Sequence, residues 1–251
     1  RWALSPAARP SLVTRMQSRA GLVGLLLVGV LLLPILIPVV VGLLLAVRAA
    51  ERREQRAPGP PARGPGVGDA PVIGARVETL MKYSGYFVQN QLSLVSVVKP
   101  GRLRRAVVRL VLLYVSFRTA YIDVFGKLDG LPSVHFAHWN FIDDRRRLLF
   151  LSNYDGTWEA YLGDFVDFAY KGLNAIWSNV VGFPPTRWLA FEGASSAERM
   201  SAFVGSQQVP CALWWAAYPS LSVLNVENDI AIREGLAAPT LSDPAAWLQR
   251  F

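Results

Sequence analysis

Apolar residues are concentrated in one uninterrupted stretch of the chain, residues 21–47 (GLVGLLLVGVLLLPILIPVVVGLLLAV). This stretch of 27 residues contains no charged side chain and no Asn, Gln, Ser or Thr. As an α-helix it would be about 40 Å long, more than the ~30 Å hydrocarbon core of a membrane requires. A buried helix of a soluble core is the alternative, but a soluble helix of this length needs a polar face. The pattern therefore predicts a single transmembrane helix, kinked at Pro34 and Pro38 against a partner helix.

Arginine-rich segments flank this stretch on both sides. Residues 1–20 form a basic tail, and residues 48–71 have the proline, glycine and arginine content of a semi-extended linker. Four arginines precede the stretch and five follow it, so the positive-inside rule leaves the orientation open. We therefore expect a single-pass protein of the inner (cytoplasmic) membrane with a folded domain over residues 72–251. The side of that domain stays open, with the cytoplasmic side favoured.

The rest of the chain alternates between strand-like and helix-like patterns. Residues 89–98 read as a strand, and residues 133–142 and 147–154 form a predicted β-hairpin around the polar turn at 143–146. Helical patterns cover residues 102–125 and begin again at residue 157. A strand over 187–191, a helix over 195–203, a strand over 209–217 and a helix over 220–235 follow. This order predicts an α+β fold, a ferredoxin-like antiparallel sheet with helices on one face.

The helix that begins at residue 157 has an apolar and a polar face. Asp155 or Thr157 is placed to cap its free N–H groups. The apolar face carries Trp158, Tyr161, Leu162, Phe165 and Phe168, and the polar face carries Glu159, Asp164, Asp167 and Lys171. We expect the aromatic face to pack against the hairpin, and the carboxylates to be solvated rather than catalytic.

The helix over residues 102–125 begins with a stripe of arginines. Arg102, Arg105 and Arg109 follow one another at i, i+3 and i+7, on one helix face. The next residues are apolar almost all round, so three interpretations stay open. The helix packs on the sheet, or it lies in the lipid headgroup layer, or it forms a second membrane span with costly buried charges. The first is favoured, and the arginine stripe is predicted to contact the membrane or a partner protein.

The net charge of +8 is unevenly distributed. Residues 1–70 hold nine arginines against three acidic residues, so residues 71–251 carry only +2. Because a nucleic-acid-binding domain has a basic folded surface, nucleic acid is not an expected partner. Tryptophan and tyrosine are abundant in the folded part. They form either a core rich in aromatic rings or an exposed docking surface, and both interpretations stay open.

Few residues suggest chemistry. His135 and His138 are the two histidines, and on a regular strand their odd spacing sends them to opposite faces, so no shared metal site is predicted. A haem with one axial histidine stays open, as does a histidine with a backbone partner. Cys211 is the one cysteine, which forbids an internal disulfide, and it is expected to be inert packing within a strand. No glycine-rich phosphate loop or nucleophile elbow is present.

Several runs resemble a widespread bacterial family of uncharacterised proteins: HFAHWNFIDD…RLLFLSNYDGTWEAYLGDF, with VQNQLSLVSVVKPGRLRR upstream and WSNVVGFPPTRW and WWAAYP downstream. The family is similar to the dimeric α/β-barrel, ferredoxin-like superfamily of Dyp-type peroxidases and chlorite dismutases. The resemblance covers residues 85–236. His138 stands where the family motif HFARW has arginine, and only the end of the peroxidase signature GxxDG is kept, at residues 153–156. The resemblance implies the fold more than the haem chemistry.

Two functions from different classes follow. The first is a non-catalytic accessory or scaffolding subunit of a membrane assembly, such as a respiratory or photosynthetic complex. It would need no cofactor or metal, and would contact the membrane and neighbouring subunits through Arg102, Arg105, Arg109, Pro34 and Pro38. The alternative is a membrane-tethered enzyme for haem-dependent or small-molecule oxidation, in which His135 or His138 binds haem.

Overall fold

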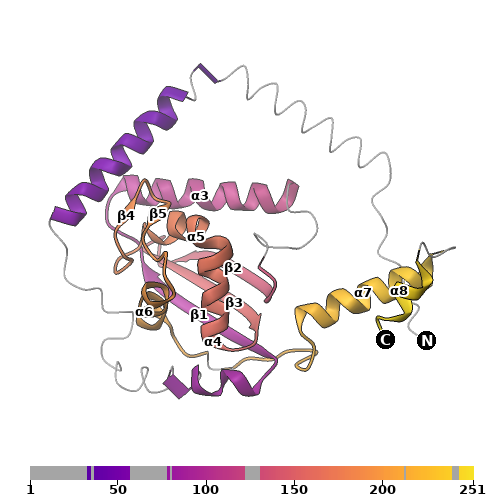
Figure 1. Ribbon diagram of the computed structural model, residues 1–251. Coiled ribbons are helices and arrows are strands. Elements are labelled where there is room, and N and C mark those ends of the chain that lie inside the picture. The colour runs from indigo at the N-terminus through magenta and orange to yellow at the C-terminus, as the bar shows by residue number, and fades with distance from the viewer. Residues whose placement is uncertain are drawn as a thin grey trace. The chain divides into compact units, whose positions relative to one another are not determined.

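The computed structural model describes residues 33–34, 37–56, 78–79, 81–121, 131–211, 213–238 and 243–251 (Figure 1). The chain divides into two compact units, Arg1–Ala49 and Ala50–Phe251. The second unit contains η1 (Ser84–Tyr86), β1 (Gln89–Val97), α3 (Arg102–Tyr121), β2 (Val134–Ile142), β3 (Arg147–Asp155), α4 (Trp158–Asp164), the π-helix η2 (Phe165–Ala169), α5 (Tyr170–Trp177), β4 (Thr186–Arg187), β5 (Phe191–Glu192), α6 (Ala197–Gln207), α7 (Val223–Ala237) and α8 (Pro244–Leu248). The predicted α+β class is confirmed.

The predicted transmembrane helix over residues 21–47 is contradicted. No helix among the described residues is both long enough and apolar enough to cross a membrane. Residues 37–56 are helical, but only residues 37–47 of this helix precede its charged segment at 48–56. Residues 21–32, 35 and 36 lie outside the described residues. The predicted kink is therefore described only at Pro34 and Pro38, which are both exposed. The single-pass topology and the inner-membrane location, which both rested on that helix, are corrected with it.

Three antiparallel strands form the main sheet, in the order β1-β3-β2. Central β3 buries Leu148, Phe150 and Tyr154 on the face toward the core, whereas Leu151 on the opposite face is 38% exposed. Because successive side chains of a strand point to opposite faces, this burial follows the alternation in the sequence. The predicted strand at residues 89–98 and the predicted hairpin are confirmed.

The sheet has no fourth strand among the described residues, although one was predicted over residues 209–217. A single bridge between Leu94 and Gln208 takes its place beside β1, with a bond from the Val209 N–H to the Ser93 carbonyl (2.9 Å). Pro210 comes next, and proline has no N–H with which to continue a ladder. The ferredoxin-like sheet of the prediction is therefore corrected to a small three-stranded sheet.

The strand predicted over residues 187–191 is instead a tight hairpin of β4 and β5. In its turn Trp188 and Leu189 have φ angles of 56° and 64°, which non-glycine residues rarely adopt. The carboxylate of Glu51 accepts hydrogen bonds from both backbone N–H groups (3.0 and 2.9 Å) and from the Thr186 hydroxyl (2.9 Å). Glu51 is 2% exposed. A buried carboxylate distant in the sequence thus holds the turn.

Residues 50–56 belong to the folded unit, although they fall in the predicted linker. Glu54 accepts hydrogen bonds from the Arg104 guanidinium (Nε 3.0 Å and Nη2 2.8 Å) and from Lys99 Nζ (2.8 Å). Arg104 is 3% exposed on the inner face of α3, so Glu54 supplies the carboxylate that a buried guanidinium requires. Burial lowers the pKa of Lys99, and the hydrogen bond to Glu54 opposes that effect.

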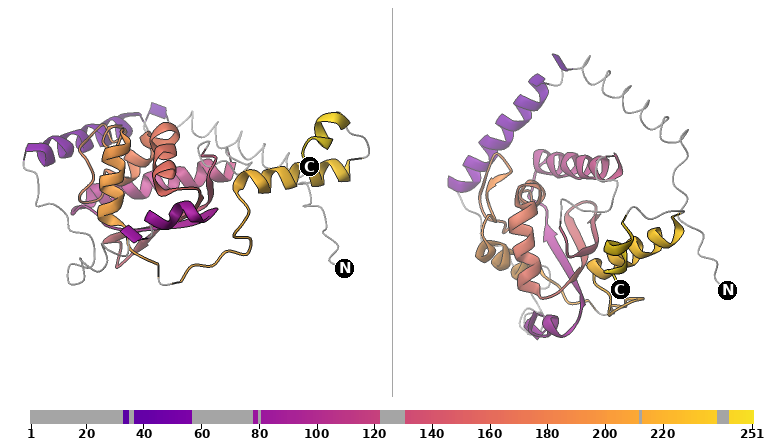
Figure 2. Two further views of the ribbon diagram at one scale, coloured as in Figure 1. Left: turned by 60° about the horizontal axis from the view of Figure 1, so that its bottom comes forward. Right: turned by 45° about the vertical axis from the view of Figure 1, so that its right-hand side comes forward.

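Aromatic rings fill the core between the sheet and the helices that follow it. Phe150 of β3 contacts Trp177 edge to face, with centroids 5.5 Å apart, and Tyr154 stacks on Tyr161 at 4.0 Å. α3 packs on α5 beside this core (Figure 2). α3 is therefore a helix packed in the domain, as favoured, and residues 122–125 of its predicted range lie outside the described residues.

The helix after the hairpin contains a π-helical turn that changes which residues are buried. Thr157 caps it, its hydroxyl accepting the Ala160 N–H (3.2 Å). Trp158, Tyr161, Leu162 and Phe165 are buried, as predicted, but Phe168 is 55% exposed and Ala169 is buried in its place. A π-turn is a local over-wide turn, so it shifts the residues after it around the helix axis. The prediction that Phe168 shares the buried face is wrong for this reason.

The buried tyrosines of this core predict how stability depends on pH. Burial, with a smaller contribution from Glu159, raises the pKa of Tyr154 above its ordinary value. In the unfolded chain a tyrosine loses its proton at about pH 10. The unfolded state then binds fewer protons than the native state, so the free energy of unfolding is expected to fall as the pH rises above about 10.

Urea unfolding between pH 8 and pH 11 measures this decline. Tyr154→Phe should make it shallower, and Tyr86→Phe, at a site 79% exposed, serves as the matched control. Equal slopes for the two variants would contradict the assignment to Tyr154.

Candidate anion-binding site

The arginine stripe predicted from the sequence lies on the outer face of α3. Arg102, Arg105 and Arg109 are exposed, whereas Arg104, Val107 and Val108 of the same turns are buried. The buried residues fix the rotation of the helix, so the three arginines of the stripe face away from the core. Arg105 Nε donates to the Gly101 carbonyl (3.3 Å), which holds its guanidinium near the start of the helix.

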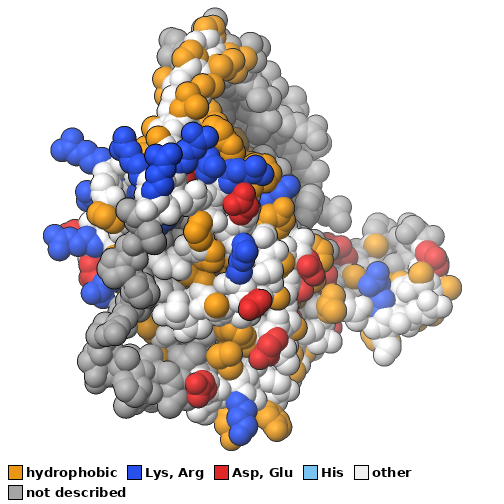
Figure 3. Space-filling view, turned by 60° about the vertical axis from the view of Figure 1, so that its left-hand side comes forward, with side chains coloured by type: hydrophobic (Ala, Val, Ile, Leu, Met, Phe, Trp, Pro, Cys, Tyr) orange, Lys and Arg blue, Asp and Glu red, His pale blue; other side chains and the backbone are white. Residues whose placement is uncertain are grey.

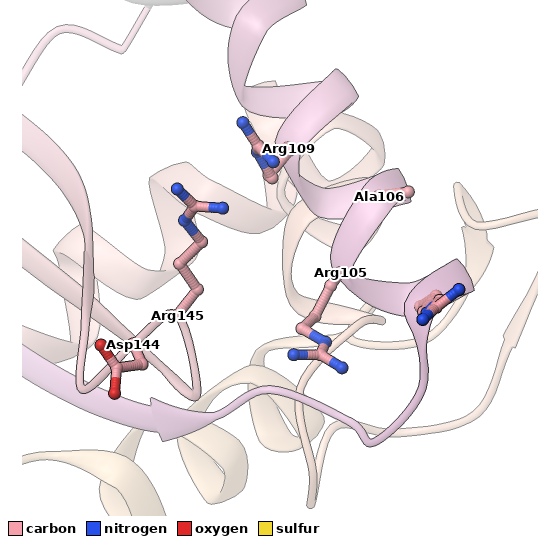
Figure 4. A pocket seen from close by; sticks show the side chains of 6 residues that line it. Arg105, Ala106, Arg109, Asp144 and Arg145 are labelled. Carbon is pink, nitrogen blue, oxygen red and sulfur yellow. The ribbon is translucent and has the colours of Figure 1, made fainter.

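A fourth arginine comes from the turn between β2 and β3. Asp143, Asp144 and Arg145 have φ angles of 51°, 52° and 65°, and the Arg146 N–H closes the turn on the Asp143 carbonyl (2.9 Å). The Asp143 carboxylate also pairs with Arg147 Nε (3.1 Å). In Figure 4 Arg145 extends from this turn toward α3, and Asp144 points away from the helix.

These arginines surround one open cavity of about 530 Å³. It is lined by Arg102, Arg105, Ala106, Arg109, Asp144 and Arg145, a formal net charge of +3. Within the part of the chain that the structure describes, none of the four guanidinium groups is paired with a carboxylate. Figure 3 shows lysine and arginine side chains gathered in a band on the face that it presents. Guanidinium groups bind carboxylates and phosphates through two parallel hydrogen bonds, so the cavity is suited to an anionic group.

The structure brings the predicted arginines together and adds one that the sequence did not single out. Arg102, Arg105 and Arg109 line the same cavity, as their spacing predicts. Arg145 was assigned only to a polar turn; the signal available was that the hairpin turn itself is charged (DDRR). Pro34 and Pro38 belong to the other unit and are no part of this site.

The two histidines have different surroundings. β2 has a bulge between Val134 and Phe136, and His135 is the residue without a partner on β3. Its Nε2 lies 2.6 Å from Asp155 Oδ1, and Asp155 Oδ2 accepts the N–H of Val223, the first residue of α7 (2.6 Å). Asp155 therefore anchors His135 and α7, and is not the cap of the following helix. His138 pairs with Leu151 and is exposed.

The haem alternative stays a prediction. Asp155 engages Nε2 of His135, and the His135 side chain is 6% exposed. No cluster of three or more His, Cys, Asp or Glu side chains suited to a metal ion occurs in the described ranges. Cys211, expected to be packed within a strand, is exposed in an irregular segment.

No protein-family model matches the chain, and no curated protein or solved structure matches it either. The resemblance to the dimeric α/β-barrel superfamily therefore stays a prediction.

Proposed function

We propose that this protein is a non-catalytic accessory subunit that docks on a protein partner by binding the partner's carboxylates in its arginine cavity. The observation that carries the proposal is the cavity itself, in which Arg102, Arg105, Arg109 and Arg145 converge without a carboxylate partner among the described residues. Arginine stays protonated at all physiological pH values, so it binds and orients anions but does not exchange protons. The site is therefore suited to recognition rather than to acid–base catalysis.

A protein partner is favoured over nucleic acid by the charge balance of the folded part. Residues 71–251 carry a net charge of only +2, so the positive potential is local to the cavity and its surroundings. Tracking a phosphate backbone requires an extended basic surface. One cavity of about 530 Å³ suits a few carboxylates of an acidic segment instead.

The test is binding of a fluorescent octa-glutamate peptide, followed by anisotropy at low salt. We expect Arg105→Ala/Arg109→Ala to raise the Kd by roughly tenfold or more, because each charge-assisted hydrogen bond contributes about 1.5–3 kcal/mol. Arg105→Lys/Arg109→Lys should recover only part of the affinity, since lysine lacks the planar fork.

Arg53→Ala is the matched control, because Arg53 is exposed and does not line the cavity. Equal Kd values for the control and the double alanine variant would refute the site. Displacement of the peptide by pyrophosphate at far lower concentration than by free octa-glutamate would overturn the assignment to a carboxylate-bearing partner.

A further inference from the structure

We propose that a second cavity of this protein binds a small, neutral aromatic molecule that carries a ring carbonyl group. This inference goes beyond the proposed function and does not rest on it, because the second cavity and the arginine cavity share no lining residue. The observations that carry it are the aromatic lining of the cavity, its volume, and two buried side chains that each keep a free hydrogen-bond donor.

The second cavity, here called the aromatic cavity, lies where the start of β1 and the end of β3 meet the start of α4 and the segment after α6. Its walls include the aromatic residues Phe87, Tyr154, Trp158 and Trp214 and the amide residues Gln91 and Gln208. None of the described residues that line it carries a charge. Because a buried ion needs a charged partner, a neutral ligand with flat apolar faces suits this cavity better than an anion or a cation.

The volume of the aromatic cavity limits the ligand to a small ring system. The cavity measures about 230 Å³. A cavity of about 150 Å³ holds one benzene ring, whereas sites for drug-sized ligands begin at about 300 Å³. One substituted ring or two fused rings therefore fit this cavity.

Gln208 supplies the first free donor. It is 5% exposed, and its amide Oε1 accepts a hydrogen bond from Nε1 of Trp158 (2.9 Å). Because an indole N–H can only donate, this bond requires the amide oxygen on the side of Trp158 and places Nε2 on the other side. Nε2 donates to none of the residues that the structure describes. The backbone of Gln208 is fixed by its bridge to Leu94 and by the bond from its N–H to the Val204 carbonyl (2.9 Å).

Tyr154 supplies the second free donor. It is 1% exposed, and its ring stacks on that of Tyr161 with the centroids 4.0 Å apart. The hydroxyl of Tyr161 donates to Ser152 Oγ (2.6 Å), whereas the hydroxyl of Tyr154 has no hydrogen-bond partner within the described part of the chain. Burial raises the pKa of Tyr154, so its hydroxyl stays protonated at neutral pH and remains a donor.

These two donors select the chemical class of the ligand. Buried polar groups of native proteins are nearly always hydrogen-bonded, so both donors call for an acceptor. A carbonyl oxygen has lone pairs and no proton, so it can accept from the Tyr154 hydroxyl and from the Gln208 amide. A planar ring that carries the carbonyl also packs against the aromatic walls. We therefore expect aromatic lactones, ketones or quinones of one or two rings to bind.

The rim of the aromatic cavity is held in place by hydrogen bonds within the chain. Asn90 Nδ2 donates to the carbonyls of Ser84 and Gly156 (both 2.8 Å). The N–H of Gly156 donates to the Val88 carbonyl (3.0 Å). These bonds fix the segment that carries Phe87, whose side chain lines the cavity and is 61% exposed. A preformed site loses less conformational freedom when a ligand binds.

The test is equilibrium dialysis of the full chain against coumarin, a planar two-ring lactone, and against naphthalene, a planar two-ring hydrocarbon of similar size. We expect coumarin to bind about tenfold more tightly, because only coumarin offers the two buried donors an acceptor. Tyr154→Phe should remove most of this preference and leave naphthalene binding unchanged, since phenylalanine keeps the ring and its stacking. Tyr86→Phe is the matched control, because Tyr86 is 79% exposed and does not line the cavity.

Cys211 reports whether the ligand occupies this cavity. It is the one cysteine of the chain, its side chain is exposed, and it lines the aromatic cavity. Bound coumarin should slow its reaction with dithionitrobenzoate, and Tyr154→Phe should raise the coumarin concentration needed for this protection by about tenfold. Equal affinities for coumarin and naphthalene, unchanged coumarin binding in Tyr154→Phe, or a Cys211 reaction rate that coumarin does not alter would each overturn the inference.

Discussion

Replacing Phe165 by alanine is expected to lower the free energy of unfolding by about 3–5 kcal/mol, the usual cost of removing a buried aromatic ring. Phe165 is 2% exposed and contacts the rings of Phe150, Tyr161 and Trp177. Because the whole domain is stabilised by only about 5–15 kcal/mol, this single change should weaken it severely. Urea unfolding monitored by tryptophan fluorescence gives the value.

Phe168→Ala is the matched control, since the same residue type lies three positions along the same helical segment. Phe168 is 55% exposed after the π-turn, so its replacement should change the free energy by less than about 0.5 kcal/mol. Comparable losses for both variants would show that the turn is α-helical in solution, with Phe168 on the buried face.

Replacing Glu51 by alanine is expected to cost about 2–4 kcal/mol, because it leaves three donors of the β4–β5 hairpin without their acceptor. Two of these donors are the N–H groups of Trp188 and Leu189, whose left-handed backbone is itself unfavourable without that acceptor. The loss should therefore be concentrated in the hairpin. Urea unfolding gives the magnitude, and faster hydrogen exchange at these two amides locates it.

Arg53→Ala tests whether the effect belongs to Glu51 itself. Arg53 lies two residues along the same helical segment and is exposed, so its replacement should change stability by less than about 0.5 kcal/mol. If Glu51→Ala proves as mild as Arg53→Ala, residues 50–56 are the linker that the sequence predicted.

Local patterns in the sequence predict the parts of the fold that local physics decides. The alternation over residues 133–142 and 147–154 specifies the hairpin and its register, and the hydroxyl of Thr157 specifies the start of α4. The spacing of Arg102, Arg105 and Arg109 likewise places three cavity residues on one face. Each inference uses residues within a few positions of one another.

The features that sequence reasoning missed depend on contacts between residues distant in the sequence, or on the extra residue that a π-helical turn contains. Glu51 meets Trp188 across 137 positions, and its surroundings in the sequence are those of a linker. Arg145 reaches the cavity only because the hairpin and α3 lie side by side. Phe168 turns outward because the helix has one over-wide turn. None of these leaves a periodic signal.

β1 is an edge strand of the main sheet, and the segments that cover its outer edge have a consequence for aggregation. An edge strand offers unpaired backbone groups to any other strand, and proteins must cover or interrupt such edges. Here the N–H groups of Val209 and Val181 bond to the outward carbonyls of Ser93 and Val97, at 2.9 and 2.8 Å. Irregular chain, not a strand, therefore occupies the middle and the C-terminal end of this edge. A strand from another chain therefore cannot pair along the whole of β1, which limits the cross-β stacking that joins sheets irreversibly.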